Sequence, residues 1–392
     1  MELDAYVNYI TNLISSFIKG DTAEPFPAHL DAGLFYKFCA FHKLQNLVYR
    51  ALANTHMPEE LEKVLKASYL NSLNFMAVQQ HFIEMVENAF EDAGIDYFIM
   101  KGIETAKFYP SSDMRQSSDF DIYIGNEKAE QARDIMVSLG FSVDDYADDD
   151  GHDKYMINKN ILCELHRVLI HNDFPWKEEC NNIPHRVIKS SGKEHRYEMS
   201  IEDAYLYNLA HAANHIKTAG IGIRVFVDLW LLWSKCKDGF DMAYLEEKLA
   251  KANLTKFEEC SRALFLYWFE GKKTDDATIM AMAEFVAESG WIGTYNQYVS
   301  AKLAGESAEG SSSASAKFES YRKMIFPSYK DLVNRYPTAG EYKFLVPYFY
   351  VHRIVKSIFG KDKGAKRVTH EIKNADLKQG QDLLKLKKEI GL

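Results

Sequence analysis

The sequence has few cysteines, and none stands at a metal-binding spacing. Its 392 residues include five cysteines, all widely separated and without a Cys-x-x-Cys pair. An odd number of scattered cysteines excludes a dense disulfide framework and a zinc site built from cysteines, and it is typical of a reducing compartment. We therefore expect a cytoplasmic protein.

Long apolar runs and the glycine-rich nucleotide motifs are also absent. The longest apolar run, Val225–Trp233, is interrupted by Asp228 and falls short of the roughly 18 residues that a membrane span needs. The acidic start Met1-Glu2-Leu3-Asp4 does not resemble a secretory signal. The sequence contains no P-loop, no Gly-x-Ser-x-Gly and no Rossmann glycine pattern. We expect no membrane partner.

The chain as a whole lacks a basic excess. It has 47 Lys and Arg against 56 Asp and Glu, a formal net charge of −9 at pH 7, so bulk electrostatics do not attract it to nucleic acid. Residues 353–392 are the exception, with eleven basic and five acidic side chains. This basic end favours a phosphate-bearing partner slightly, although most such helix faces are simply solvated.

What the sequence does contain is a patterned globular chain, with 47% hydrophobic and 26% charged residues. Apolar residues at three- and four-residue spacing predict helices over 1–93, among them 32–54 and a long one, 58–93, that ends at Gly94. From Ser200 onward the same spacing predicts a helical region over 201–392, interrupted by a flexible stretch at 306–316.

Between these helical regions, residues 94–200 alternate short apolar runs with short helices. This alternation predicts a mixed β-sheet, and the fold class is α+β with helical segments on both sides. The strands are expected at 95–100, 119–124, 141–146, 154–157, 161–170 and 195–199, and the helices at 103–109 and 126–139, the latter capped by Asn126. The predicted division is therefore 1–93, 94–200 and 201–392.

The strongest local feature is Asp119-Phe120-Asp121 at the start of a predicted strand. Because side chains alternate along a strand, both carboxylates lie on one face and Phe120 on the other. Two neighbouring carboxylates repel each other unless a cation neutralises them, and Mg²⁺ prefers carboxylate and phosphate oxygens. Two solvated acids at a strand end would give the same pattern.

Other residues strengthen the metal interpretation. Glu164 and His166 share one face of a later strand, and a carboxylate within an apolar strand needs a partner. Lys101-Gly102 lies where a strand turns into a helix, a place where backbone N–H groups can approach a phosphate. The polar loop before Asp119 contains three further candidates for phosphate contacts, Arg115, Ser117 and Ser118.

With these residues the chain resembles the DNA polymerase beta-like nucleotidyltransferase superfamily, and within it an uncharacterised bacterial nucleotidyltransferase family. The motifs that carry the resemblance are Met100-Lys101-Gly102, Tyr109-Pro110, Arg115, Asp119-Phe120-Asp121 and Glu164-Leu165-His166. It extends to Ser200-Ile201-Glu202-Asp203, His211, His215, Arg224 and Asp228, and to residues 321–353. A nucleotidyltransferase-like core with helices is the fold that this resemblance implies.

The resemblance implies a role for each matched position. Asp119, Asp121 and Glu164 would be the catalytic residues and would bind two Mg²⁺ ions, with Mn²⁺ as an alternative. Lys101, Gly102, Arg115, Ser117 and Ser118 would bind the nucleotide phosphates. Lys101-Gly102 departs from the Gly-Gly or Gly-Ser pair of the superfamily, which leaves the manner of triphosphate binding open.

Two residue pairs in the helical region have several interpretations. His211 and His215 lie one helical turn apart, a spacing that suits zinc, a substrate-facing pair or a structural pair; Ala212 occupies the acidic position of a His-Glu-x-x-His motif. Arg224 and Asp228 have the same spacing, for which an intrahelical ion pair is the default and a place in the cleft is the alternative.

The leading hypothesis is a Mg²⁺-dependent nucleotidyltransferase that moves an NMP group from an NTP, with ATP as the expected donor, to a hydroxyl of an unidentified acceptor, releasing pyrophosphate. The alternative is a module of the same fold that binds a nucleotide or a partner without turnover. A metal-dependent phosphohydrolase that uses the histidine pair is a third, weaker option. The sequence does not identify the acceptor or the oligomeric state.

Overall fold

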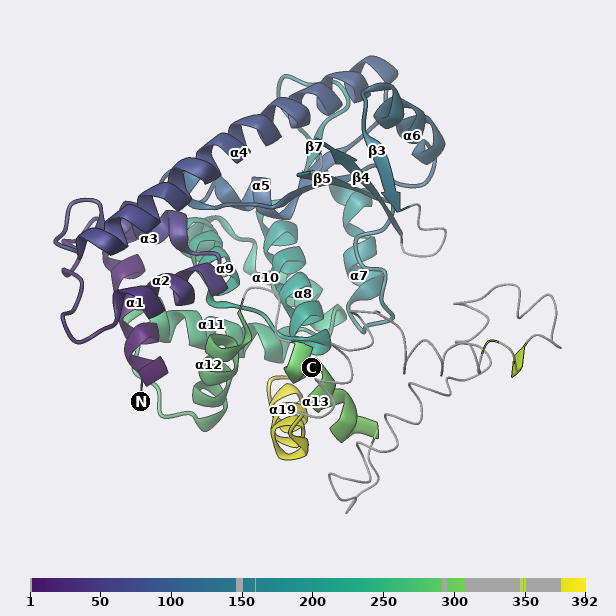
Figure 1. The fold of residues 1–392 in the computed structure, drawn as a ribbon. Coiled ribbons are helices and arrows are strands. Elements are labelled where there is room, and N and C mark those ends of the chain that lie inside the picture. Colours follow the sequence, from purple (N-terminus) through teal and green to yellow (C-terminus); the bar gives the residue numbers. More distant parts are fainter. Residues whose placement is uncertain are drawn as a thin grey trace.

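A computed structural model describes residues 2–145, 151–158, 160–290, 295–306, 346–347, 349 and 375–392. Figure 1 shows a mixed sheet beneath one long helix, with a bundle of further helices below the sheet. The predicted α+β architecture, in which helical segments precede and follow the strands along the chain, is confirmed. The expected flexible stretch at 306–316 and the residues 321–353 fall almost entirely outside the described residues.

The N-terminal helices are α1 (Glu2–Lys19), α2 (Ala32–Phe41), α3 (Gln45–Leu52) and α4 (Glu59–Ala93). The prediction of one helix over 32–54 is wrong, because the chain breaks at residues 42–44. Lys43 there has a φ of 56°, a left-handed conformation that ends a right-handed helix. The expected end of α4 is confirmed, since Gly94 caps it with a φ of 65°.

A five-stranded sheet has the order β1-β2-β5-β4-β3, in which β2 and β5 are parallel and the other neighbours antiparallel. The strands are β1 (Phe98–Met100), β2 (Asp119–Tyr123), β3 (Ser142–Asp145), β4 (His152–Ile157) and β5 (Ile161–His166). Several are shorter than predicted; β5, for example, ends at His166 instead of residue 170.

Short elements join the strands. They are α5 (Lys101–Ala106), the 3-10 helix η1 (Ser112–Met114) and α6 (Ala129–Ser138). The expected start of α6 at Asn126 is wrong, because Lys128 occupies the N-cap position and no side chain caps the helix. After β5 follow α7 (Lys177–Asn181), the 3-10 helix η2 (Ile183–Arg186) and the hairpin β6 (Ile188–Lys189) and β7 (Tyr197–Glu198).

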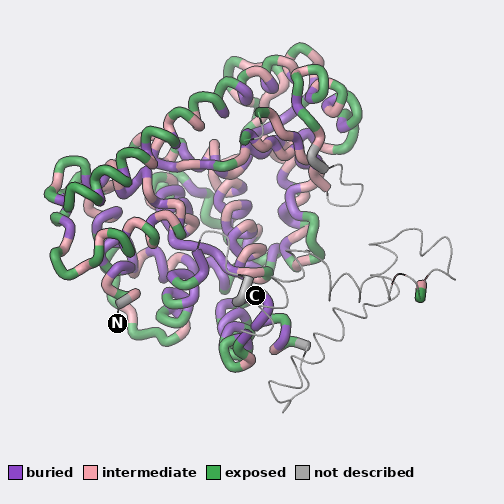
Figure 2. Tube along the Cα trace, in the orientation of Figure 1, coloured by how far each residue is buried: buried purple, intermediate pink, exposed green. Residues whose placement is uncertain are grey.

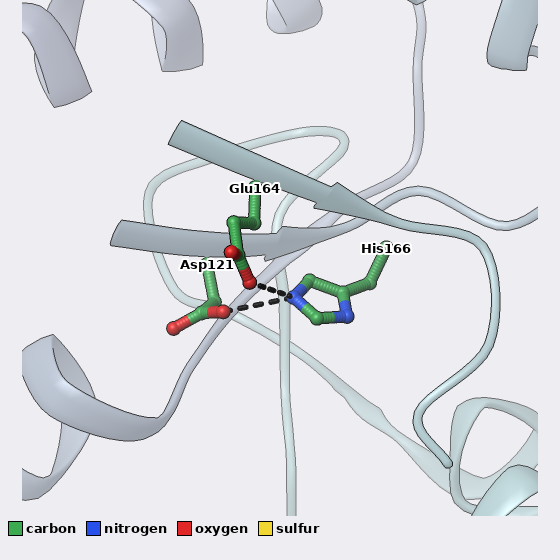
Figure 3. A group of neighbouring side chains, drawn as sticks. All are labelled: Asp121, Glu164 and His166. Atoms are coloured by element: carbon green, nitrogen blue, oxygen red, sulfur yellow. Dashed lines mark hydrogen bonds and ion pairs between the residues drawn. The ribbon is translucent and has the colours of Figure 1, made fainter. Parts of the chain in front are cut away.

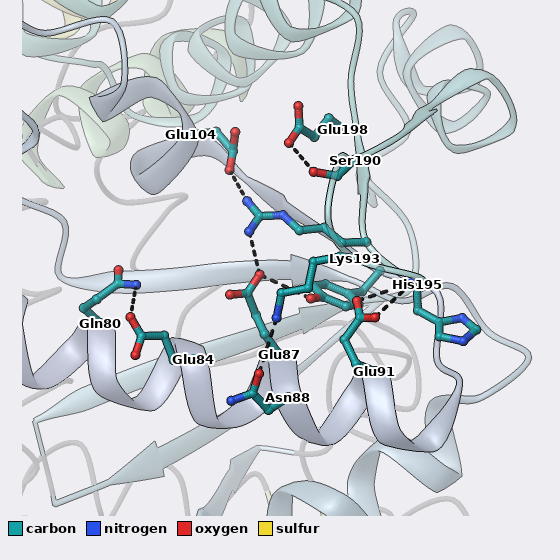
Figure 4. Close-up of polar contacts among 12 residues, drawn as sticks. Gln80, Glu84, Glu87, Asn88, Glu91, Glu104, Ser190, Lys193, His195 and Glu198 are labelled. Atoms are coloured by element: carbon teal, nitrogen blue, oxygen red, sulfur yellow. Dashed lines mark hydrogen bonds and ion pairs between the residues drawn. The ribbon is translucent and has the colours of Figure 1, made fainter.

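Polar contacts hold this hairpin against α4 (Figure 4). Arg196 donates hydrogen bonds to Glu87 on α4 and to Glu104 on α5, at 2.8 and 3.1 Å. Glu91 accepts hydrogen bonds from the backbone N–H groups of Glu194 and His195. The hairpin is thereby tied to both the long helix and the helix that follows β1.

The C-terminal helices begin with α8 (Ile201–Thr218), and the Ser200 hydroxyl caps its N-terminus by accepting the N–H of Asp203. They continue with α9 (Ile223–Cys236), the 3-10 helix η3 (Lys237–Gly239), α10 (Met242–Lys251), α11 (Thr255–Glu270), α12 (Ala277–Ser289), α13 (Tyr295–Glu306) and α19 (Leu377–Glu389). Among the described helices, none combines the length and apolar character that a membrane span requires.

The sheet has two different faces. Phe120, Ile122 and Cys163 point to a core shared with α4 and α6, whereas Phe98 and Met100 pack into a larger core formed by helices from both ends of the sequence. Buried residues run through both layers in Figure 2. Side chains from residues 1–93 and from residues 201–270 pack in the same larger core. The predicted domain boundaries at residues 93 and 200 therefore do not separate two cores, and they stay a prediction.

His42 connects the break after α2 to two distant helices. Its Nε2 lies 3.1 Å from the carbonyl oxygen of Ala287, and its Nδ1 accepts the N–H of Ile223 at 3.3 Å. One ring nitrogen therefore donates and the other accepts, which requires a neutral imidazole. Burial lowers the pKa of His42 to about 4.

We expect this histidine to make the protein sensitive to acid. The folded-state pKa is below the unfolded value of about 6.5, so its contribution to stability is complete above pH 6.5 and is lost as the pH falls toward 4. One such group changes the unfolding free energy by at most about 1.4 kcal/mol per pH unit. Denaturant unfolding at pH 7 and pH 4.5 should show a smaller loss in His42→Gln than in wild type. The exposed His29→Gln is the control, and an unchanged loss in His42→Gln would contradict the assignment.

Candidate active site

The acids of the predicted motif lie on the sheet face opposite the α4 core. Asp121 pairs in register with Glu164 across the parallel strands β2 and β5, so the two side chains point to the same side of the sheet. Cys163 precedes Glu164 on β5 and is in register with Phe120 on β2. Both of these side chains point into the core on the other side of the sheet. The strand period thus explains why the acids converge while the cysteine stays inert.

Asp121, Glu164 and His166 form a compact group (Figure 3). Their potential ligand atoms all lie within 4.8 Å of one another, and His166 Nε2 is 2.8 Å from an oxygen of Asp121 and 3.6 Å from one of Glu164. Two carboxylates and an imidazole are ligands that a divalent cation accepts. In the part of the chain that the structure describes, no other group of His, Cys, Asp and Glu meets this criterion.

Asp119 lies on the same face of β2 but outside that compact group. Its carboxylate accepts a hydrogen bond from the Ser117 hydroxyl at 3.3 Å. Burial and the neighbouring carboxylate of Asp121 raise the pKa of Asp119. His166, which the sequence resemblance gives as a residue that could orient Glu164 or touch the substrate, thus lies against Asp121 and Glu164, while Asp119 lies at the edge of the group.

Lys101 supplies the positive charge that Asp121 needs. The Lys101 ammonium lies 2.9 Å from the Asp121 carboxylate, and both side chains are largely buried. Burial alone would raise the pKa of Asp121, but Lys101 and His166 outweigh burial and hold this pKa well below its usual range. Lys101 has a φ of 47° at the start of α5, an unusual conformation for a residue with a side chain. Its ammonium thus contacts the acid that the sequence hypothesis assigned to a metal.

The loop between α5 and β2 packs tightly against Gly102. A Cβ on Gly102 would come within 2.7 Å of Arg115 Nη1 and closer still to the Ser117 hydroxyl. A side chain at this position would therefore require Arg115 and Ser117 to move. The expected candidates Gly102, Arg115 and Ser117 are therefore neighbours, while Ser118 is exposed to solvent.

Arg115 is held by an acid from the helical region. Its guanidinium donates to both oxygens of Asp228, with Nε–Oδ1 at 3.0 Å and Nη2–Oδ2 at 2.9 Å, and Tyr109 donates to the same carboxylate at 2.7 Å. The default prediction of an intrahelical Arg224–Asp228 pair is therefore wrong. Arg224 donates instead to the backbone carbonyl of Gln116 at 2.9 Å.

The histidines of α8 face the Lys101 side of the site. His211 and His215 lie with their Nε2 atoms 3.1 Å apart, so one ring donates to the other. Burial, with His215, Lys101 and other nearby charges, lowers the pKa of His211, and burial and Lys101 lower that of His215 to about 4. Both rings are therefore neutral at physiological pH. Neither belongs to a described metal-ligand group, so the zinc interpretation gains no third ligand.

The residues matched by a known family model include this whole site. Residues 28–270 match the model described as uncharacterised nucleotidyltransferase, which is more than half of the chain. The chain belongs to this family. The narrower resemblance stated from the sequence is therefore confirmed, although family membership does not identify the acceptor.

Among solved structures, this chain is similar to that of the antibiotic-resistance factor ANT(2'')-Ia. The identity is 14%, the match covers 50% of this chain and 95% of that one, and the TM-score is 0.32. Similarity at this level does not establish a shared fold. No curated protein matches the chain.

The sequence hypothesis did not include Tyr207, which lies near Lys101. Tyr207 is fully buried on α8, its hydroxyl has no hydrogen-bond partner among the described atoms that meets normal geometry, and its pKa is raised by burial while Lys101 opposes the shift. It precedes His211 by one helical turn, so the same spacing that singled out the histidines would have found it.

Breaking the buried pair between Lys101 and Asp121 should destabilise the protein. Asp121→Asn leaves the Lys101 ammonium without its buried counter-charge, and we expect the unfolding free energy to fall by about 3–5 kcal/mol. The double variant Asp121→Asn, Lys101→Met should recover much of this loss. Denaturant unfolding in metal-free buffer measures both.

Asp119→Asn is the matched control, because Asp119 accepts a hydrogen bond from Ser117 and has no ion pair with Lys101 as short as that of Asp121. The decrease in unfolding free energy caused by Asp119→Asn should be well under half of the decrease caused by Asp121→Asn. Equal losses in both single variants, or a double variant no more stable than Asp121→Asn, would contradict the assigned pairing.

Proposed function

We propose that the protein is a Mg²⁺-dependent nucleotidyltransferase that transfers an NMP group from an NTP to a hydroxyl of an acceptor and releases pyrophosphate. The observation that carries the proposal is the convergence of Asp121, Glu164 and His166 on one sheet face, beside Asp119. Membership of a nucleotidyltransferase family supports the reaction class. ATP is the proposed donor, and two Mg²⁺ ions, or Mn²⁺ in their place, are the proposed cofactors.

The donor set fits a hard divalent cation. Asp121 and Glu164 offer carboxylate oxygens, and Asp119 offers a third carboxylate next to them on β2. Bound to these acids, a divalent cation would supply the positive charge that stabilises the phosphoryl oxygens and the leaving pyrophosphate. Phosphoryl transfer depends mainly on such positioning and charge, so the acids themselves need not form a covalent bond.

The surrounding side chains would position the acids. His166 lies within hydrogen-bonding distance of Asp121 and close to Glu164, which restrains both carboxylates. Lys101 holds Asp121 from the other side. Ser117 orients Asp119 through its hydroxyl. We propose that Glu164 lies on the acceptor side of the site and that His211 and His215 form part of the wall facing the substrate.

Removing the charge of Asp119 or of Glu164 should strongly reduce turnover. Asp119→Asn and Glu164→Gln each remove one negative ligand from the site while leaving the Lys101–Asp121 pair in place, and we expect activity to fall by about a hundredfold to a thousandfold. Pyrophosphate release from NTPs with Mg²⁺ and a metabolite extract as the acceptor source measures the effect. The exposed Glu130→Gln on α6 is the control and should retain wild-type turnover.

The same assay separates this proposal from a binding module without turnover. Wild-type protein that binds ATP in calorimetry but releases no pyrophosphate with any tested extract would favour the binding module. Full turnover in both Asp119→Asn and Glu164→Gln would contradict the site itself.

A further inference from the structure

A cavity lies between the N-terminal helices and the loop that precedes β2. Its volume is about 460 Å³, within the range of small-molecule sites. Residues from the break after α2, from α3, from α4 and from that loop line it, including Lys43, Gln45, Ser68, Asn71 and Gln116. Its lining contains amides, hydroxyls, two aromatic rings and one cation but no carboxylate, in a protein with a net charge of −9.

Lys43 connects this cavity to the acids. It lines the cavity from the break between α2 and α3, where its φ of 56° fixes the direction of the chain. Burial and the nearby Arg224 lower the pKa of Lys43, whereas Asp119 opposes this shift. The Lys43 ammonium thus lies in the electric field of both Arg224 and the first acid of the motif.

Gln116 forms the other link. Gln116 lines the cavity, and its backbone carbonyl accepts the hydrogen bond from Arg224. It precedes Asp119 by three residues. Burial and the Arg115 guanidinium lower the pKa of Arg224 to about 10. Arg115 shares its charge with Asp228 in a two-point pair.

Cationic side chains from three separate elements therefore gather at the Asp119 end of the site. Arg224 lies near both Lys43 and Arg115. These three cations outnumber the two carboxylates beside them, Asp119 and Asp228, which leaves a net positive charge that an anion stabilises. A polyphosphate is matched to the net positive charge at this end of the site.

We propose that Lys43 and Arg224, together with the Gln116 end of the cavity, bind the β- and γ-phosphates of the NTP. This inference rests on the proposed function and adds a substrate-binding residue from the N-terminal helices, outside the loop and strand motifs. The α-phosphate would lie beside Asp119 and Asp121, and the leaving pyrophosphate would depart on the Lys43 side.

Calorimetric binding to three probes tests the proposal: a non-hydrolysable ATP analogue with Mg²⁺, tripolyphosphate with Mg²⁺, and AMP. Loss of one charged hydrogen bond to phosphate is expected to weaken binding by about tenfold to a hundredfold. Lys43→Met should show this loss for the ATP analogue and tripolyphosphate, with AMP affinity changed less than about twofold. Lys43→Arg should restore much of the affinity.

Lys37→Met on α2 is the matched control, since it removes the same charge from an exposed position six residues earlier. Thermal melting without ligand shows whether each variant is folded. If wild type binds the ATP analogue and a folded Lys43→Met binds it equally well, the inference is overturned, but the proposed function is not. An equal loss for AMP would also overturn it, because the lysine would then contact the nucleoside part. No binding of any probe to wild type would overturn the proposed function instead.

Discussion

The buried carboxylate of Asp121, held between a lysine and a histidine, is the interaction on which the site depends. A carboxylate with 4% exposure is costly unless opposite charge and hydrogen bonds surround it. Lys101 arrives from the start of α5 and His166 from the end of β5, so the pair of contacts fixes three elements around one oxygen. The geometry of the acids is therefore set by the folded chain before any ligand binds.

This arrangement also gives Lys101 a definite electrostatic role. Lysine stands where the wider superfamily has a small residue, and its ammonium lies on the acid that a cation would otherwise neutralise. A divalent cation at Asp121 would share that carboxylate with Lys101, so the lysine would reduce the net negative charge of the proposed cation site. The left-handed backbone at Lys101 is a local cost that the buried ion pair offsets.

Sequence reasoning succeeded where a short-range period decided the outcome. The two-residue period of a strand placed Asp119 and Asp121 on one face, and the parallel register of β2 with β5 added Glu164. It failed where the partner lay far along the chain. The one-turn spacing of Arg224 and Asp228 predicted a local pair, but Asp228 binds Arg115, 113 positions away, because the Arg115 guanidinium reaches both carboxylate oxygens in a buried two-point contact. No spacing rule contains that information.

Lys43, the proposed phosphate-binding residue, illustrates the same limit. It belongs to a segment that the sequence predicted as continuous helix, and only the break after α2 directs it toward the loop before β2. The acids come from a small sheet, but the cations around them come from the N-terminal break, the β2 loop and α9. The family match, which begins at residue 28 and ends with α11, contains all of these elements. The acids and the cations therefore come from different parts of the chain, and only the folded protein would bring together the charge pattern that the proposed phosphoryl transfer requires.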